Sequence, residues 1–115
     1  MEPEDVFERL NQGEQPLFID ARRVDAFEAS ERKLPGAIRV DPQDADRAVE
    51  AIPRGGLIVV YCTCPREASA VRTSERLHSL GFNDVHVLAG GFDAWESRRF
   101  PTEMKSAASA APSQQ

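Results

Sequence analysis

Short apolar runs recur along the chain, separated by stretches in which apolar residues have helical spacing. The longest run covers residues 57–62, Leu-Ile-Val-Val-Tyr-Cys. Because this run is continuous rather than alternating, it indicates a strand buried on both faces, as in a parallel sheet covered by helices. Residues 17–19, 37–40 and 85–88 are shorter runs that also predict strands, so we expect four strands in all.

Helices are predicted between these strands from the spacing of apolar residues. The expected segments are one around residues 6–10, then residues 24–29, 41–52, 67–80 and 92–97. Pro42 suits the first position of the third helix, and Gly81 suits the position just beyond the fourth. Since strands and helices alternate throughout, the pattern favours an α/β fold with a mostly parallel central sheet and helices on both faces.

Length and tail composition indicate one folded domain. The chain has 115 residues, enough for a single hydrophobic core. Residues 105–115 are mostly Ala, Ser, Pro and Gln and show no periodicity. We therefore expect residues 1–104 to form the domain and residues 105–115 to be a disordered tail.

Charge and hydropathy argue against several functional classes. The formal net charge is −5, whereas a nucleic-acid interface needs Lys and Arg clustered on one face, so no nucleic-acid partner is expected. No apolar run has the length of a membrane span, and the acidic start lacks the apolar core of a signal peptide. We expect a cytoplasmic protein without membrane contact, and a monomer because its sheet is already covered.

Cys62 is the first candidate for chemistry. Sites in parallel sheets form at the carboxyl ends of strands, and Cys62 ends the strand expected to be the most buried. The loop of residues 62–69 leads into a helix, so its backbone N–H groups and the helix dipole would stabilise a thiolate. Arg66 could add positive charge to the same loop.

A second cysteine, Cys64, stands two residues after the first. Such a close pair is not a disulfide framework of the kind that holds small secreted domains. Two interpretations of Cys64 stay open, a packed loop residue or a second working thiol. A metal site is not expected, because the pair offers only two ligands while His78 and His86 fall on a predicted helix and strand.

Several short motifs occur in a characteristic order around these cysteines. They are Asp20-Ala21-Arg22 after a strand, Leu34-Pro35-Gly36-Ala37-Ile38, the apolar strand ending in Cys62, residues 88–95 (Leu-Ala-Gly-Gly-Phe-Asp-Ala-Trp), and Phe100-Pro101-Thr102-Glu103. In this order they resemble the rhodanese-like domain, whose patterns include Asp-x-Arg, Ile-Pro-Gly-Ala and Leu-x-Gly-Gly-x-x-x-Trp. The resemblance spans roughly residues 3–103.

This resemblance implies a sulfurtransferase with Cys62 as its nucleophile. Cys62 would take the outer sulfur of thiosulfate or of a persulfide donor, hold it as a persulfide, and pass it to a thiol or to cyanide. The implied substrate-binding residues are Thr63, Cys64, Pro65, Arg66, Glu67 and Ala68. The implied partners are a small sulfur donor and a thiol acceptor, with a persulfide-carrying protein as a further candidate, and no cofactor is implied.

Glu67 departs from the family pattern, because many active members have Arg five positions after the catalytic Cys. A carboxylate there should repel thiosulfate, although an acid also suits the first turn of a helix. Ala68 stands where the phosphatase branch of the superfamily has Arg, which disfavours phosphate chemistry.

We expect Asp20 and Arg22 to tie loops together near the site. The alternative function is a non-catalytic rhodanese-like module that binds partners or senses redox state.

Overall fold

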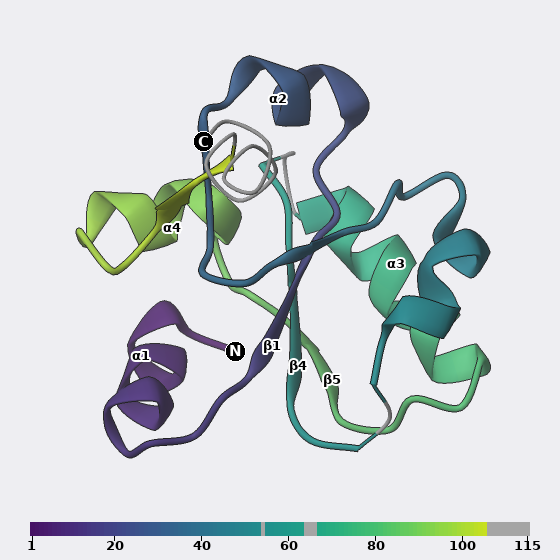
Figure 1. Cartoon of the computed structure of the whole chain (residues 1–115), viewed down its shortest axis with the longest axis horizontal. Helices are drawn as coiled ribbons and strands as arrows, with labels where there is room; N and C mark the ends of the chain where they lie inside the picture. Colours follow the sequence, from purple (N-terminus) through teal and green to yellow (C-terminus); the bar gives the residue numbers. More distant parts are fainter. Residues whose placement is uncertain (54, 64–66, 106–115) are drawn as a thin grey trace, which may run out of the picture.

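The computed structural model describes residues 1–53, 55–63 and 67–105 (Figure 1). Its elements are, in chain order, α1 (Pro3–Asn11), β1 (Leu17–Asp20), α2 (Val24–Ala29), β2 (Arg32–Lys33), β3 (Ile38–Arg39), the 3-10 helix η1 (Ala45–Ala51), β4 (Ile58–Tyr61), α3 (Ala68–Ser79), β5 (Val85–Val87), α4 (Gly91–Ser97) and β6 (Glu103–Met104). None of the helices in these ranges is long and apolar enough to cross a bilayer.

A parallel sheet in the order β3-β1-β4-β5 forms the centre of the fold. All four residues of β4 are buried, which explains why this segment is a continuous apolar run. The sheet and its helices confirm the predicted fold class. α2 lies beyond the carboxyl ends of the strands, at the top of the view in Figure 1.

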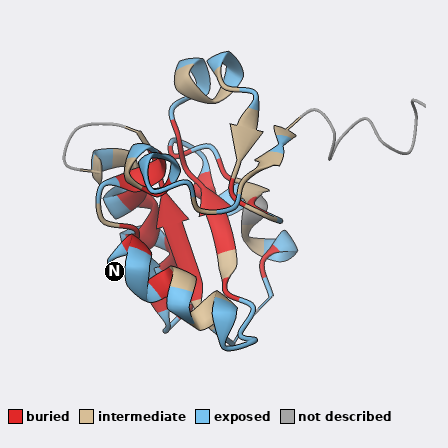
Figure 2. Cartoon of the chain, turned by 90° about the vertical axis from the view of Figure 1, so that its left-hand side faces the viewer, coloured by how far each residue is buried: buried red, intermediate tan, exposed pale blue. Residues whose placement is uncertain are grey.

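Helices cover both faces of this sheet, so the core has two halves. Tyr61 of β4 belongs to the buried cluster on the side of α1 and α4, where Trp95 packs. Val60 and Cys62 belong to the opposite cluster, together with Leu77 of α3. The alternation follows from the two-residue period of a strand, and the buried strands lie between exposed helix surfaces in Figure 2.

The segment after β3 differs from the predicted helix over residues 41–52. Residues 41–44 form a turn in which Asp44 N–H donates to the Asp41 carbonyl, while the Asp41 side chain accepts a bond from Gln43 N–H. Helical structure begins only at Ala45 and is of the 3-10 type. Pro42 therefore does not open a helix, because the Asp41 carboxylate stabilises a turn at this point instead.

A second, two-stranded sheet was not predicted at all. β2 pairs antiparallel with β6, joining Arg32 to Met104 and Lys33 to Glu103. Unlike the two-residue β3, these two strands fall in no apolar run, and they are far apart in the sequence. The pairing continues to Lys105, whose N–H donates to the Glu31 carbonyl, whereas residues 106–115 of the predicted tail lie outside the described residues.

Candidate functional site

Cys62 directly follows β4 at the carboxyl end of the sheet, and its residue surface is only 1% exposed. The Cys62 carbonyl accepts a hydrogen bond of 2.9 Å from Phe92 N–H in α4. A Cβ atom on Gly91 would lie 2.0 Å from the same carbonyl oxygen, and Gly91 has φ of +63°. Only glycine lets the start of α4 come this close, so the second Gly of the Gly90-Gly91 pair holds the Cys62 peptide in place.

The loop after Cys62 is described only at its two ends. Thr63 is half-buried, Glu67 is the N-cap of α3, and Ala68 is the first residue of that helix. The family resemblance implied substrate-binding roles for Cys64, Pro65 and Arg66, and these three lie outside the described residues.

Glu67 adopts a left-handed backbone conformation, with φ of +53° and ψ of +38°. This conformation is uncommon for a residue other than glycine, and such residues concentrate at tight turns and functional sites. Glu67 stands at the N-cap of α3, next to the first turn where an acid suits the helix dipole, and it makes no side-chain cap bond to the helix. Ala70, in the first turn of α3, belongs to the same buried cluster as Cys62. α3 follows Cys62 after a short loop, and the positive end of a helix dipole stabilises a thiolate that lies near it.

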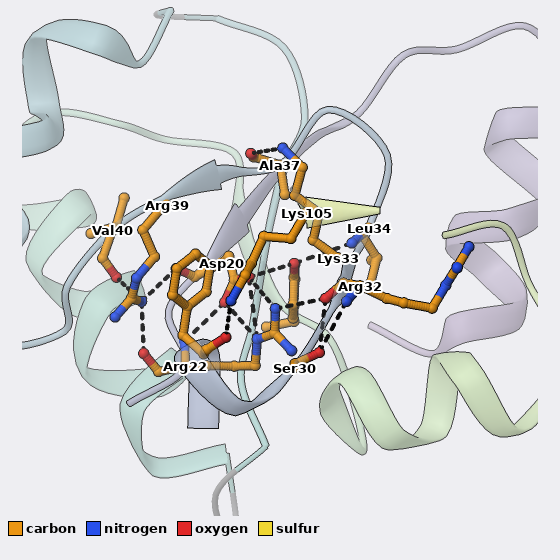
Figure 3. Close-up of polar contacts among 12 residues, drawn as sticks. Asp20, Arg22, Ser30, Arg32, Lys33, Leu34, Ala37, Arg39, Val40 and Lys105 are labelled. Carbon is orange, nitrogen blue, oxygen red and sulfur yellow. Dashed lines mark hydrogen bonds and ion pairs between the residues drawn. The ribbon is translucent and has the colours of Figure 1, made fainter. Parts of the chain in front are cut away.

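A buried polar network joins Asp20, Arg22 and Tyr61, and Tyr61 belongs to the core cluster on the opposite face of the sheet from Cys62. Figure 3 shows Asp20 and Arg22 among their polar partners. Asp20 and Arg22 form an ion pair of 2.7 Å, and each side chain is 1% exposed. The Tyr61 hydroxyl donates to Asp20 Oδ2 at 2.9 Å and accepts from Leu34 N–H at 3.2 Å. These bonds satisfy most of the polar atoms of the network and tie β1, β4 and the turn at residue 34 together, as expected for Asp20 and Arg22.

The charges of this network follow from its burial and pairing. Burial opposes the charge of Arg22, but its hydrogen bond and ion pair with Asp20 outweigh that effect and raise its pKa. Burial, reinforced by the Asp20 carboxylate, raises the pKa of the Tyr61 phenol far above its usual value. Tyr61 is therefore neutral, and its hydroxyl donates a hydrogen bond to Asp20.

Arg22 also links the network to the residues that hold Cys62. Its guanidinium lies 4.7 Å from the centre of the Phe92 ring and 5.7 Å from that of Tyr61. Phe92 supplies the N–H that binds the Cys62 carbonyl, and Tyr61 precedes Cys62 in the chain. The sequence analysis missed the role of Tyr61, although a tyrosine at the end of a buried apolar strand already signals that its hydroxyl needs a partner.

The described residues hold no group of three His, Cys, Asp or Glu side chains that could bind a metal ion. The two histidines form hydrogen bonds elsewhere. His78 is hydrogen-bonded to the carbonyl oxygen of Val85, and His86 to the carboxylate of Asp84.

A parallel α/β domain with a cysteine at the carboxyl end of a central strand defines a class of small thiol-bearing domains. The family model for the Rhodanese-like domain matches residues 2–98, so the chain belongs to the rhodanese-like domain family. This agrees with the resemblance that the sequence motifs suggested.

Solved structures of similar proteins support the same fold. The Alr3790 protein from Anabaena sp. superposes with a TM-score of 0.78 at 24% identity, over 97% of this chain and 87% of that one. The solution structure of the rhodanese-like domain of that protein gives 0.74 at 27% identity, over 90% and 77%. A rhodanese-related protein from Thermoplasma volcanium gives 0.73 at 15% identity, over 91% and 97%.

Proposed function

We propose that this protein is a sulfurtransferase that carries sulfane sulfur as a persulfide on Cys62. The observation that carries the proposal is the placement of Cys62 at the carboxyl end of β4, with its carbonyl held by Phe92 N–H and α3 beginning at Ala68 after a short loop. Such a position stabilises a thiolate, which is the reactive form of cysteine. Membership of the rhodanese-like family supports sulfur chemistry in particular.

The reaction divides into two displacements at sulfur. In the first, the Cys62 thiolate attacks the outer sulfur of thiosulfate, the S–S bond of the donor breaks, and sulfite leaves with the electron pair. In the second, an acceptor thiolate attacks the outer sulfur of the Cys62 persulfide, and the electron pair of that S–S bond returns to Cys62. Each step conserves charge and needs no external oxidant, so a cofactor is not required.

The preferred donor depends on Glu67. A carboxylate beside an entering dianion raises the energy of its binding, so thiosulfate is a poor donor in this proposal. A persulfide on a small thiol or on a protein carries less charge and suits the site better.

The proposal predicts a mass gain on Cys62. Incubating the protein with thiosulfate, or with a small-molecule persulfide, should add the mass of one sulfur atom, as measured by intact-protein mass spectrometry. Cys62→Ser should abolish the gain, whereas the matched variant Cys64→Ser should retain it. A folded protein that gains no sulfur from either donor would refute the proposal.

A non-catalytic module is the second candidate, and the burial of Cys62 favours it. A residue that is 1% exposed offers little surface to an incoming donor. In this case Cys62 would serve packing or redox sensing, and a thiol-specific alkylating reagent would react with it no faster than with a buried cysteine in an unrelated protein.

A further inference from the structure

α2 is a short helix that contributes nothing to the buried core. All six of its residues are described, and none of them is buried. Figure 2 shows α2 at the top of the molecule, in the colours of exposed and half-buried residues. Because isolated helices of this length are unstable in water, contacts with other elements must hold α2 in place.

Phe27 of α2 makes such contacts with three cations. The centre of its ring lies 4.4 Å from the guanidinium of Arg39, 5.5 Å from that of Arg22 and 4.0 Å from the ammonium of Lys105. Arg39 ends β3 and Arg22 follows β1, whereas Lys105 follows β6. A cation above an aromatic ring is attracted to it, so the central sheet and the segment after β6 both anchor α2.

Lys105 adds two hydrogen bonds to its contact with the Phe27 ring. Its Nζ atom donates to the carbonyl oxygen of Phe27, 78 positions away in the sequence. Its backbone N–H donates to the carbonyl oxygen of Glu31 at 2.7 Å, just beyond α2. Lys105 therefore attaches to α2 with its side chain and to the segment after α2 with its backbone.

Lys105 belongs to residues 102–105, which we call the strap. Arg32 of β2 donates from Nε to Thr102 Oγ1 at 2.6 Å, and Lys33 forms an ion pair of 3.3 Å with Glu103. All four strap residues are described, and each is half-buried or exposed. Segments that bury little apolar surface open at a lower free energy than the core does, so the strap and α2 are both of this kind.

α2 and β2 lie against Arg22, while the central sheet has bonds of its own. Arg22 is 1% exposed, and its Nη2 atom donates to the carbonyl oxygen of Arg32 at 3.0 Å. In the sheet, Ala21 N–H donates to the Tyr61 carbonyl at 2.8 Å. Detachment of α2 leaves such sheet bonds intact, because they join β1 and β4 directly.

We propose that α2 and the strap form a latch over Arg22 that opens as one unit while the central sheet stays folded. Lys105 couples the two parts, because its side chain contacts Phe27 and its backbone belongs to the strap. Opening separates the Phe27 ring from its cations and breaks the bond to the Phe27 carbonyl. Removing the charge of Lys105 shifts the latch towards the open state, since it weakens both contacts.

Amide hydrogen exchange at single residues, followed by NMR on the full chain, tests this latch. Phe27 N–H donates to the Arg23 carbonyl at 2.8 Å, and Lys105 N–H is bonded as described above. These two amides should have protection factors equal within about threefold, and both should exchange at least about a hundredfold faster than Ala21. Exchange of Phe27 no faster than that of Ala21 would overturn the inference, because α2 would then open only on global unfolding.

Variants of Lys105 test what holds the latch closed. Lys105→Gln should lower the protection of Phe27 N–H about tenfold and change that of Ala21 by less than about twofold. Lys105→Arg keeps the charge and should lower it by less than about threefold. The control Arg9→Gln removes a cation from α1 and should change neither amide. Equal protection of Phe27 in the wild type and Lys105→Gln would overturn the inference, as would equal losses at Phe27 and Ala21.

Phe27→Leu tests the coupling from the other side of the latch. This substitution removes the ring but touches no bond of the Lys105 N–H group, which donates to Glu31. If α2 and the strap open together, the protection of Lys105 N–H should fall about fivefold or more, since the ring no longer binds the cations. Unchanged protection at Lys105 would show that the strap and α2 open separately and would overturn the inference.

Discussion

At the scale of single residues, Cys62 depends on one neighbour without a side chain. Gly91 comes so close to the Cys62 carbonyl that any Cβ atom would overlap it, and the φ of +63° adds backbone strain to that overlap. The pair Gly90-Gly91 was visible in the sequence as part of the motif over residues 88–95. The contact with Cys62 was not, because it depends on how α4 meets the end of β4.

Gly91→Ala should therefore displace Cys62 as well as destabilise the fold. We expect a loss of about 3 kcal/mol in the free energy of unfolding, since a steric clash adds to the strain of about 1–2 kcal/mol for a left-handed alanine. Gly36→Ala is the matched control, because Gly36 has φ of +68° and nothing within 4 Å of its Cβ position. Urea denaturation of both variants measures the difference, and equal losses would show that the clash is relieved at no cost.

At the scale of elements, the apolar pattern predicts the long elements well and the short ones poorly. The run over residues 57–62 became β4 and Cys62, and the predicted helix 24–29 is α2 to the residue. β2 and β6 consist mostly of charged residues and fall in no apolar run, whereas β3, equally short, lies within one. Around Asp41, local side-chain bonding overrides helical spacing.

α3 carries one buried hydroxyl group without a hydrogen-bond partner in the described residues, on Thr73. Thr73 is fully buried, so its hydroxyl lost water on folding and gained nothing in exchange. Thr73→Val keeps the shape and removes the hydroxyl, and it should raise the free energy of unfolding by about 1 kcal/mol.

Thr102→Val is the control for that variant, because the Thr102 hydroxyl accepts a bond of 2.6 Å from Arg32 Nε. This substitution should lower stability by about 1–2 kcal/mol, since it leaves a charged donor unpaired. Thermal unfolding of the two variants should therefore shift in opposite directions. A lower melting temperature for Thr73→Val would contradict the assignment of an unsatisfied group.

At the scale of the whole molecule, the Asp20–Arg22–Tyr61 network connects the two central strands to the turn at residue 34. Its bonds join residues that are up to 41 positions apart in the sequence. Because both charges are buried, the network is stable only while it stays paired. Its ionisation therefore affects the stability of the entire fold.

This connection predicts a specific loss of stability at alkaline pH. The pKa of Tyr61 is raised by burial above the value of about 10 that it has in the unfolded chain. The stabilising effect of the neutral phenol is therefore complete below about pH 10 and decreases above it, by up to about 1.4 kcal/mol per pH unit.

Comparison with Tyr61→Phe isolates this effect, since Tyr61 is the single tyrosine of the chain. The difference in unfolding free energy between the two proteins should be constant from about pH 7 to about pH 9 and should shrink above about pH 10. Denaturation at each pH, followed by the fluorescence of Trp95, measures it. A constant difference up to about pH 11 would mean that the phenol titrates alike in the folded and unfolded states.

The sequence by itself determined the order of strands and helices, the parallel α/β class and the place of Cys62 at a strand end. These features follow from apolar periodicity and from the rule that parallel strands place their carboxyl ends on one edge. Only the tertiary structure decided the partners of Cys62, namely Gly91 and Phe92 behind it and the network through Tyr61 beside it. It also decided that Arg39, Glu28 and Asp41 line one hollow, because β3, α2 and the turn after β3 meet only after the chain has folded.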